Sequence, residues 1–149
     1  MSEETNAPVL TEVRGPVLIV TLNRPEAKNA ANLALAQGVA AAMDRLDSDD
    51  ALTVGIITGA GGTFCSGMDL KGFLKGERPT IPGRGFAGLT EAPPKKPLIA
   101  AVDGFALAGG MEIALACGFA SAAHFSKCYR GTYGSTPYRQ RETEAQPGS

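Results

Sequence analysis

The chain has 149 residues, of which 44% are hydrophobic and 19% are charged, and its formal net charge is −1. This length predicts a single domain, and the near-neutral charge argues against nucleic-acid binding, which depends on an excess of Lys and Arg. The charge is unevenly distributed, because residues 1–117 carry 10 basic and 13 acidic side chains, whereas residues 118–149 carry 4 and 2. The two segments therefore differ in the sign of their net charge.

The inventory of reactive side chains excludes several further classes. Cys65, Cys117 and Cys128 form no CxxC pair, and His124 is the only histidine, so neither a disulfide framework nor a metal site is predicted. The first eight residues are polar and acidic, which does not fit a signal peptide. No stretch is apolar enough to predict a membrane span. We expect a cytoplasmic protein without a membrane, metal or nucleic-acid partner.

The first predicted elements are a β-hairpin and a helix. Two apolar runs, Pro8–Val13 and Val17–Leu22, flank an Arg-Gly-Pro turn and predict the hairpin. A helix follows from about Asn32 to Leu46, since apolar residues recur there at helical spacing, namely Leu35, Val39, Met43 and Leu46.

Two short β-branched runs, Leu52–Thr58 and Leu98–Val102, are typical of strands buried on both faces. Gly72–Pro97 between them is rich in Gly, Pro and charge, which predicts a surface loop with helical fragments at most. A last helix is predicted over Gly109–Ala116. Helices alternating with strands at this spacing predict an α/β fold with parallel pairing.

Both buried strands lead through glycine into the start of a predicted helix, at Ser66–Asp69 and at Gly109–Glu112. Backbone N–H groups at a helix start have no intrahelical acceptor and favour negative charge. Two such ends converging at one sheet edge would place two donors around one oxygen, as in an oxyanion hole. The alternative is a pair of ordinary strand-to-helix turns, which spacing alone favours.

Glu112 is the strongest candidate for acid–base chemistry. It falls in the first turn of an otherwise apolar helix, and a carboxylate in apolar surroundings needs a hydrogen-bond partner or a chemical role. Simple pairing with the helix dipole is the alternative. For Asp69 a local helix cap is favoured over catalysis.

Four segments in this order resemble the crotonase family, also called the enoyl-CoA hydratase/isomerase family: Leu22–Ala30, Ile57–Lys71, Lys96–Val102 and Gly104–Ala116. Together they cover most of Val9–Cys117. The resemblance implies a partial crotonase-like spiral of ββα units and acyl-CoA chemistry, with a thioester enolate held by two backbone N–H groups. It implies no cofactor other than the coenzyme A of the substrate.

Carried onto this chain, the resemblance implies that the two N–H donors are Met68 and Gly109 and that Glu112 is the catalytic acid or base. It also implies that residues near the CoA moiety bind the substrate, namely Arg24, Ala27, Lys28, Asp69, Leu70 and Lys71. For Lys71, an exposed helix lysine without a ligand is equally plausible.

The resemblance ends after Cys117. The family continues with a strand, a Gly-x-Pro-Glu segment that carries a second glutamate, and helices that build a trimer-based oligomer, none of which this sequence contains. We expect residues 1–117 to be the front part of a crotonase-like domain and residues 118–149 to be an irregular or disordered tail. Glu142 and Glu144 in this tail are not assigned the missing role. A reading-frame shift near codon 117 is one hypothesis for its origin, which re-sequencing the coding DNA tests.

Three functions remain open at this point. The first is an acyl-CoA enzyme, for which one carboxylate favours double-bond isomerisation over hydration, and for which Glu77 and Glu91 have no spacing that recommends them as a second group. The second is a truncated, catalytically impaired remnant that retains part of a CoA-binding pocket. The third is a serine hydrolase, which is weakly supported because Ser66 lacks a GxSxG context and His124 lies in the tail.

Overall fold

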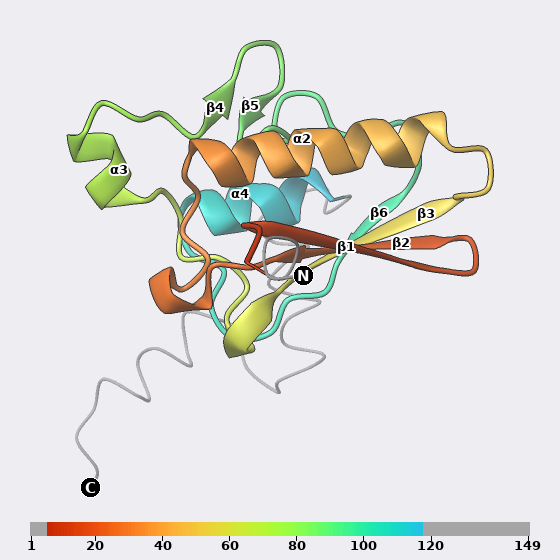
Figure 1. Ribbon diagram of the computed structural model, residues 1–149, viewed down its shortest axis with the longest axis horizontal. Coiled ribbons are helices and arrows are strands. Elements are labelled where there is room, and N and C mark those ends of the chain that lie inside the picture. Colours follow the sequence, from red (N-terminus) through yellow and green to blue (C-terminus); the bar gives the residue numbers. More distant parts are fainter. Residues whose placement is uncertain (1–5, 118–149) are drawn as a thin grey trace, which may run out of the picture. The chain divides into compact units, whose positions relative to one another are not determined.

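The structure is a computed structural model that describes residues 6–117, all within one unit of the chain, Met1–Gly118 (Figure 1). The predicted tail, residues 118–149, lies outside the described residues, and so do His124, Glu142 and Glu144. In chain order the elements are β1 (Val9–Arg14), β2 (Val17–Leu22), η1 (Pro25–Ala27), α2 (Leu33–Ser48), β3 (Val54–Gly59), η2 (Ala60–Gly62), α3 (Leu70–Leu74), β4 (Thr80–Ile81), β5 (Gly85–Phe86), β6 (Leu98–Ala100) and α4 (Gly109–Ala116).

A four-stranded sheet with the order β1-β2-β3-β6 forms the base of the unit (Figure 1). Strands β1 and β2 pair antiparallel around Gly15, whose φ of +56° is costly for a residue with a Cβ. Strand β3 pairs in parallel with both β2 and β6. The predicted hairpin, the parallel pairing and the α/β class are therefore confirmed.

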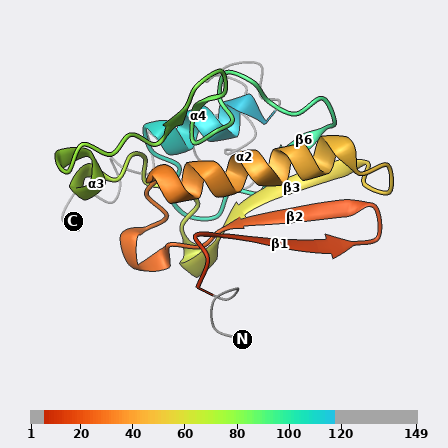
Figure 2. The same ribbon diagram turned by 45° about the horizontal axis from the view of Figure 1, so that its top comes forward.

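Helix α2 runs along one face of the sheet (Figure 2). Asn32 is its N-cap, accepting a hydrogen bond from the Leu35 N–H at 2.9 Å. The four residues of the predicted apolar stripe are all buried, and each such side chain contributes about 1.5–3 kcal/mol by leaving water. The helix is thus confirmed, and it extends two residues beyond the predicted end at Leu46.

Strand β3 is fully buried on one face only. Gly55 and Ile57 are buried, whereas Val54, Ile56 and Thr58 on the other face are half-buried. Gly55 lies under α2, because a Cβ at this position would stand 2.9 Å from the Leu46 side chain. The expectation that this strand is buried on both faces is therefore wrong for the face away from α2.

The segment predicted as a surface loop contains more structure than expected. Strands β4 and β5 form a two-stranded antiparallel sheet, which sequence reasoning missed because two-residue strands show no period. Ala87, Gly88 and Leu89 beyond it are buried, and a Cβ on Gly88 would collide with the Ala36 carbonyl of α2. This part of the segment is core rather than surface.

Within residues 6–117, no helix has the length and apolar character needed to cross a bilayer.

Candidate active site

The two segments that follow β3 and β6 lie side by side. The Cys65 N–H donates to the Phe105 carbonyl at 2.9 Å, and the Leu107 N–H donates to the Cys65 carbonyl at 3.0 Å. This parallel pairing continues the alignment of the parallel strands beyond the sheet. It brings the Met68 and Gly109 regions together, although they are far apart in sequence.

Gly67 lies close to the residues at the start of α4. A Cβ built on Gly67 would stand 3.6 Å from the Gly109 nitrogen and 3.4 Å from the Ala108 Cβ. Within residues 6–117, neither the Met68 N–H nor the Gly109 N–H donates a hydrogen bond. Two unengaged amides therefore lie on adjoining segments.

The two glycines at the start of α4 allow this packing. A Cβ on Gly110 would collide with the Cys65 carbonyl, and a Cβ on Gly109 would collide with the Phe86 ring. Phe86 belongs to β5, so the segment missed by sequence reasoning contacts the site directly. In the sequence, Phe86 is a single aromatic residue in a Gly-rich stretch, and no periodic pattern there predicts that it packs against the site.

Ala108 precedes α4 in a strained conformation, with φ of +47° and ψ of −114°. A residue with a Cβ held in such a region costs about 1–3 kcal/mol, and strain of this kind concentrates at functional sites. Ala108 is also the N-cap of α4, and no side chain caps this helix. The positive end of the helix dipole is therefore left without a side-chain acceptor.

Met68 is held in place by the segment that precedes α2. The Ala31 N–H donates to the Gly67 carbonyl at 2.7 Å, and the Asp69 N–H donates to the Ala31 carbonyl at 2.9 Å. Ala31 thus binds the residues on both sides of Met68.

Asp69 forms the local cap that its position indicated. Its Oδ1 accepts hydrogen bonds from the Lys71 N–H at 3.1 Å and the Gly72 N–H at 3.3 Å. Burial raises the pKa of this carboxyl, but the hydrogen bonds from Gly72 and Arg24 outweigh it, so that the pKa lies below its usual value. Asp69 is therefore ionised at neutral pH.

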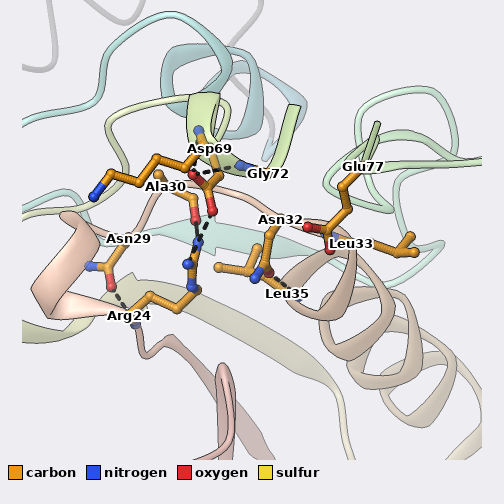
Figure 3. Close-up of polar contacts among 10 residues, drawn as sticks. Arg24, Asn29, Ala30, Asn32, Leu33, Leu35, Asp69, Gly72 and Glu77 are labelled. Carbon is orange, nitrogen blue, oxygen red and sulfur yellow. Dashed lines mark hydrogen bonds and ion pairs between the residues drawn. The ribbon is translucent and has the colours of Figure 1, made fainter. Parts of the chain in front are cut away.

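The Arg24 guanidinium points inward, between Ala30 and Asp69 (Figure 3). It donates to the Ala30 carbonyl and to the Asp69 Oδ2, the latter at 3.2 Å, and only 18% of the side chain is exposed. Sequence reasoning placed Arg24 among the substrate-binding residues. In the structure its guanidinium is engaged with the protein itself.

Asn29 is a buried polar residue for which sequence reasoning gave no role. It is fully buried with φ of +56°, and its Oδ1 accepts the Arg24 N–H at 2.8 Å. Its Nδ2 donates to the Ala60 carbonyl at 2.9 Å and the Thr63 carbonyl at 2.6 Å. Asn tolerates the left-handed region better than most residues, and this preference was the one available signal.

The remaining predicted substrate-binding residues lie at the surface or close to it. Ala27 is half-buried, Lys28 and Lys71 are exposed, and 67% of Leu70 is exposed. The Lys28 Nζ lies 5.9 Å from the centroid of the Phe105 ring, within the range of a cation–π contact.

Glu112 is exposed on α4, which corrects the expectation of apolar surroundings. Its sequence neighbours are apolar, but the buried residues of the helix are Gly110, Ile113 and Ala114. Each residue turns the helix by about 100°, so sequence neighbours do not share a face. The inference from an apolar environment therefore fails, while the position in the first turn still favours a negative charge.

Three further reactive groups, Glu77, Cys65 and Cys117, are engaged or unreactive. The Glu77 Oε1 accepts the Leu33 N–H at the start of α2, at 3.3 Å. Burial raises the pKa of the Cys65 thiol and raises that of Cys117 to about 12, so neither is a thiolate at neutral pH. Among residues 6–117, no group of three or more His, Cys, Asp or Glu side chains could hold a metal ion.

Comparison with known proteins gives concordant matches. A family model described as enoyl-CoA hydratase/isomerase matches residues 12–136. The crystal structure of enoyl-CoA hydratase EchA1 from Mycobacterium marinum is 61% identical, with a TM-score of 0.72 over 74% of this chain and 43% of that one. A carnitinyl-CoA hydratase from Mycobacterium avium is 41% identical, with a TM-score of 0.72 over 76% and 45%. The enoyl-CoA hydratase EchA19 of Mycobacterium tuberculosis is 43% identical over 121 residues, which are 74% of this chain and 44% of that protein.

This chain spans less than half the length of each of these three relatives. The family match continues past Cys117 to residue 136. The described unit has the crotonase fold of its structural relatives, as the resemblance implied. On the family match and these likenesses together, the chain belongs to the enoyl-CoA hydratase/isomerase, or crotonase, family.

Proposed function

We propose that this chain binds an acyl-CoA thioester and supports enoyl-CoA hydratase/isomerase chemistry, with the Met68 and Gly109 N–H groups stabilising the thioester enolate oxygen. One observation carries the proposal. Gly67 lies next to the Gly109 nitrogen, and within residues 6–117 neither the Met68 N–H nor the Gly109 N–H donates a hydrogen bond. Names of relatives in the same family, including enoyl-CoA and carnitinyl-CoA hydratases, agree with it.

Amide donors suit this reaction because negative charge develops on the thioester oxygen when a proton leaves the adjacent carbon. Fixed N–H groups stabilise this charge without transferring a proton, and each such donor is worth roughly 10²–10³ in rate. The uncapped start of α4 adds the favourable end of a helix dipole.

Glu112 is the proposed acid–base group. In an isomerisation, one carboxylate removes a proton from one carbon and returns it to another, so that the double bond moves and no atom is gained or lost. Hydration, in contrast, needs a base that activates water and an acid that protonates the α-carbon, which favours two carboxylates. With one proposed carboxylate, isomerisation is the branch that this segment supports best.

The proposed substrate-binding residues lie on two segments, the 27–28 loop that the resemblance assigns to CoA and the residues that follow the Met68 donor. Lys28 and Lys71 are exposed cations that can pair with CoA phosphates, and Ala27 and Leu70 lie beside them in sequence. The proposed reaction needs no cofactor besides the coenzyme A of the substrate. The family resemblance implies a trimer-based oligomer, but the helices that build it are missing from this sequence, and light scattering tests which oligomer the chain forms.

A second candidate is acyl-CoA binding without turnover. Two nearby carboxylates favour it, because both already accept hydrogen bonds from the protein. Glu77 accepts from the Leu33 N–H, and Asp69 accepts from Arg24 and from two backbone amides. Neither is free to act as the second carboxylate of a hydratase.

Two substrates and one variant pair test these functions. Crotonyl-CoA loses its conjugated thioester absorbance on hydration, and a 3-enoyl-CoA gains that absorbance on isomerisation. Turnover of either that disappears in Glu112→Gln and persists in Glu91→Gln, an exposed carboxylate elsewhere, supports the first proposal. Turnover retained in Glu112→Gln removes Glu112 from the mechanism. Calorimetric binding of acyl-CoA without turnover supports the second candidate, and the absence of both overturns the proposed function.

A further inference from the structure

The structure suggests a role for Arg24 other than ligand binding. Its guanidinium joins two segments that are distant in sequence. One is the 28–31 segment, through the Ala30 carbonyl, and the other is the start of α3, through Asp69 (Figure 3). The backbone N–H of Arg24 is fixed as well, by the buried Asn29.

Both segments determine where the Met68 amide lies. Ala31 follows Ala30 directly, and it binds the carbonyl of Gly67 and the N–H of Asp69. A shift of either segment would therefore move the Gly67–Met68 peptide group, which carries the Met68 N–H.

The Arg24–Asp69 ion pair is largely buried, which strengthens it against such a shift. The side chains of Arg24 and Asp69 are 18% and 16% exposed, so salt and water screen this pair less than a surface pair. Arginine is suited to the task because its planar guanidinium carries several donors in fixed directions and can hold a carbonyl and a carboxylate at once. Lysine carries the same charge without that fixed geometry.

We propose that Arg24 is a positioning residue that, through Asp69 and Ala30, holds the Met68 N–H in place as an oxyanion donor. This inference rests on the proposed function for the role of the donor. It assigns to Arg24 a task within the protein instead of contact with CoA phosphate.

Substitutions at Arg24 and Asp69 separate the contribution of their ion pair from that of Asp69 as the cap of α3. In Asp69→Asn the remaining amide oxygen can still cap Lys71 and Gly72, whereas the NH2 group that replaces Oδ2 is a donor and cannot accept the hydrogen bond from Arg24. Arg24→Met removes the guanidinium, and Arg24→Lys keeps the charge alone. The matched control is Asp44→Asn, which breaks the exposed ion pair between Asp44 on α2 and Arg84.

Two measurements on the full chain test the proposal. The first is hydrogen exchange at the Ala31 and Asp69 amides, whose hydrogen bonds to the Gly67 and Ala31 carbonyls flank Met68. We expect this exchange to become faster in Arg24→Met and Asp69→Asn, to recover partly in Arg24→Lys and to stay unchanged in Asp44→Asn. Unchanged exchange at both amides in both site variants, with circular dichroism showing intact folding, overturns the positioning role.

The second measurement compares acetoacetyl-CoA with coenzyme A. The enolate of acetoacetyl-CoA has its own ultraviolet absorbance and needs the donors, whereas coenzyme A has no thioester carbonyl. We expect Arg24→Met to weaken enolate formation by about 10–100-fold, with an unchanged affinity for coenzyme A. Equal weakening of both ligands assigns Arg24 to CoA binding and overturns the proposal. Wild-type protein that binds coenzyme A but forms no enolate defeats the proposed function instead, and the exchange of the Ala31 and Asp69 amides then still decides the positioning role.

Discussion

Gly67 stands against the backbone nitrogen of Gly109, at 3.6 Å from the position that a Cβ on Gly67 would occupy. This contact joins the segment after β3 to the first residue of α4. The candidate site therefore depends on close packing at the start of α4, where a Cβ on Gly109 or Gly110 would collide with its neighbours.

Gly110→Ala should be strongly destabilising. The new Cβ meets the Cys65 carbonyl, which is backbone and cannot rotate away, and overpacking of this kind costs about 1–3 kcal/mol or more. Urea unfolding measures the change. Gly15→Ala is the control, because its Cβ would meet nothing within 4 Å and only the positive φ opposes it. A Gly110→Ala protein as stable as the Gly15→Ala protein would contradict the observed packing.

Gly109→Ala and Phe86→Ala should compensate each other. The Cβ at position 109 collides with the Phe86 ring, a side chain whose removal frees the space. In a double-mutant cycle we expect a favourable coupling of about 1–3 kcal/mol between the two changes. Phe86→Ala should give no such relief to Gly110→Ala, whose obstacle is the Cys65 backbone. Additive effects at positions 86 and 109 would show that the ring does not pack on this glycine.

Asn29→Ala should cost more than Asn32→Ala. Loss of the buried Asn29 side chain leaves the Arg24 N–H and the Ala60 and Thr63 carbonyls without this partner, and each buried polar group left unsatisfied costs about 1–3 kcal/mol. Loss of Asn32 removes one helix cap, worth about 1 kcal/mol. Thermal unfolding of both variants checks the order, and the reverse order would be inconsistent with the buried network.

The contribution of Asp69 to stability should disappear in acid. Its pKa is lowered in the folded protein, so the ionised carboxylate stabilises the fold fully above the unfolded value of about 4, and this contribution is lost as the pH falls through the folded value. Asp69→Asn should therefore cost about 1–2 kcal/mol at pH 7 and progressively less below about pH 4. Urea unfolding across this pH range measures the difference. A gap between wild type and variant that widens in acid would reverse the assigned sign.

The elements that sequence reasoning predicted are those whose signals are local. An apolar stripe predicted a helix from about Asn32, which is the N-cap of α2, and an Arg-Gly-Pro turn between two apolar runs predicted the hairpin around Gly15. The paired glycines predicted a helix from Gly109, the first residue of α4. Each signal is a backbone preference that acts within a few residues.

The features that sequence reasoning missed depend on contacts between distant segments. The inward direction of Arg24 is decided by Asp69, 45 residues away, and the contact of Phe86 with Gly109 crosses from β5 to α4. Glu112 was misjudged because its neighbours in sequence are apolar, whereas exposure depends on the helix face. Such relationships appear only once the segments are packed.

The first turns of α2 and α3 are capped by the side chains of Asn32 and Asp69, which accept from the second or third amide of each helix. In α4 the amides at those two positions, Gly110 and Met111, donate instead to the Leu107 and Ala108 carbonyls. The backbone alone thus closes the start of this helix, and within residues 6–117 the Gly109 N–H is the one amide of its first three without an acceptor. Ser or Asp at position 108 should therefore add little stability to α4 and should leave the Gly109 N–H available to a substrate oxygen.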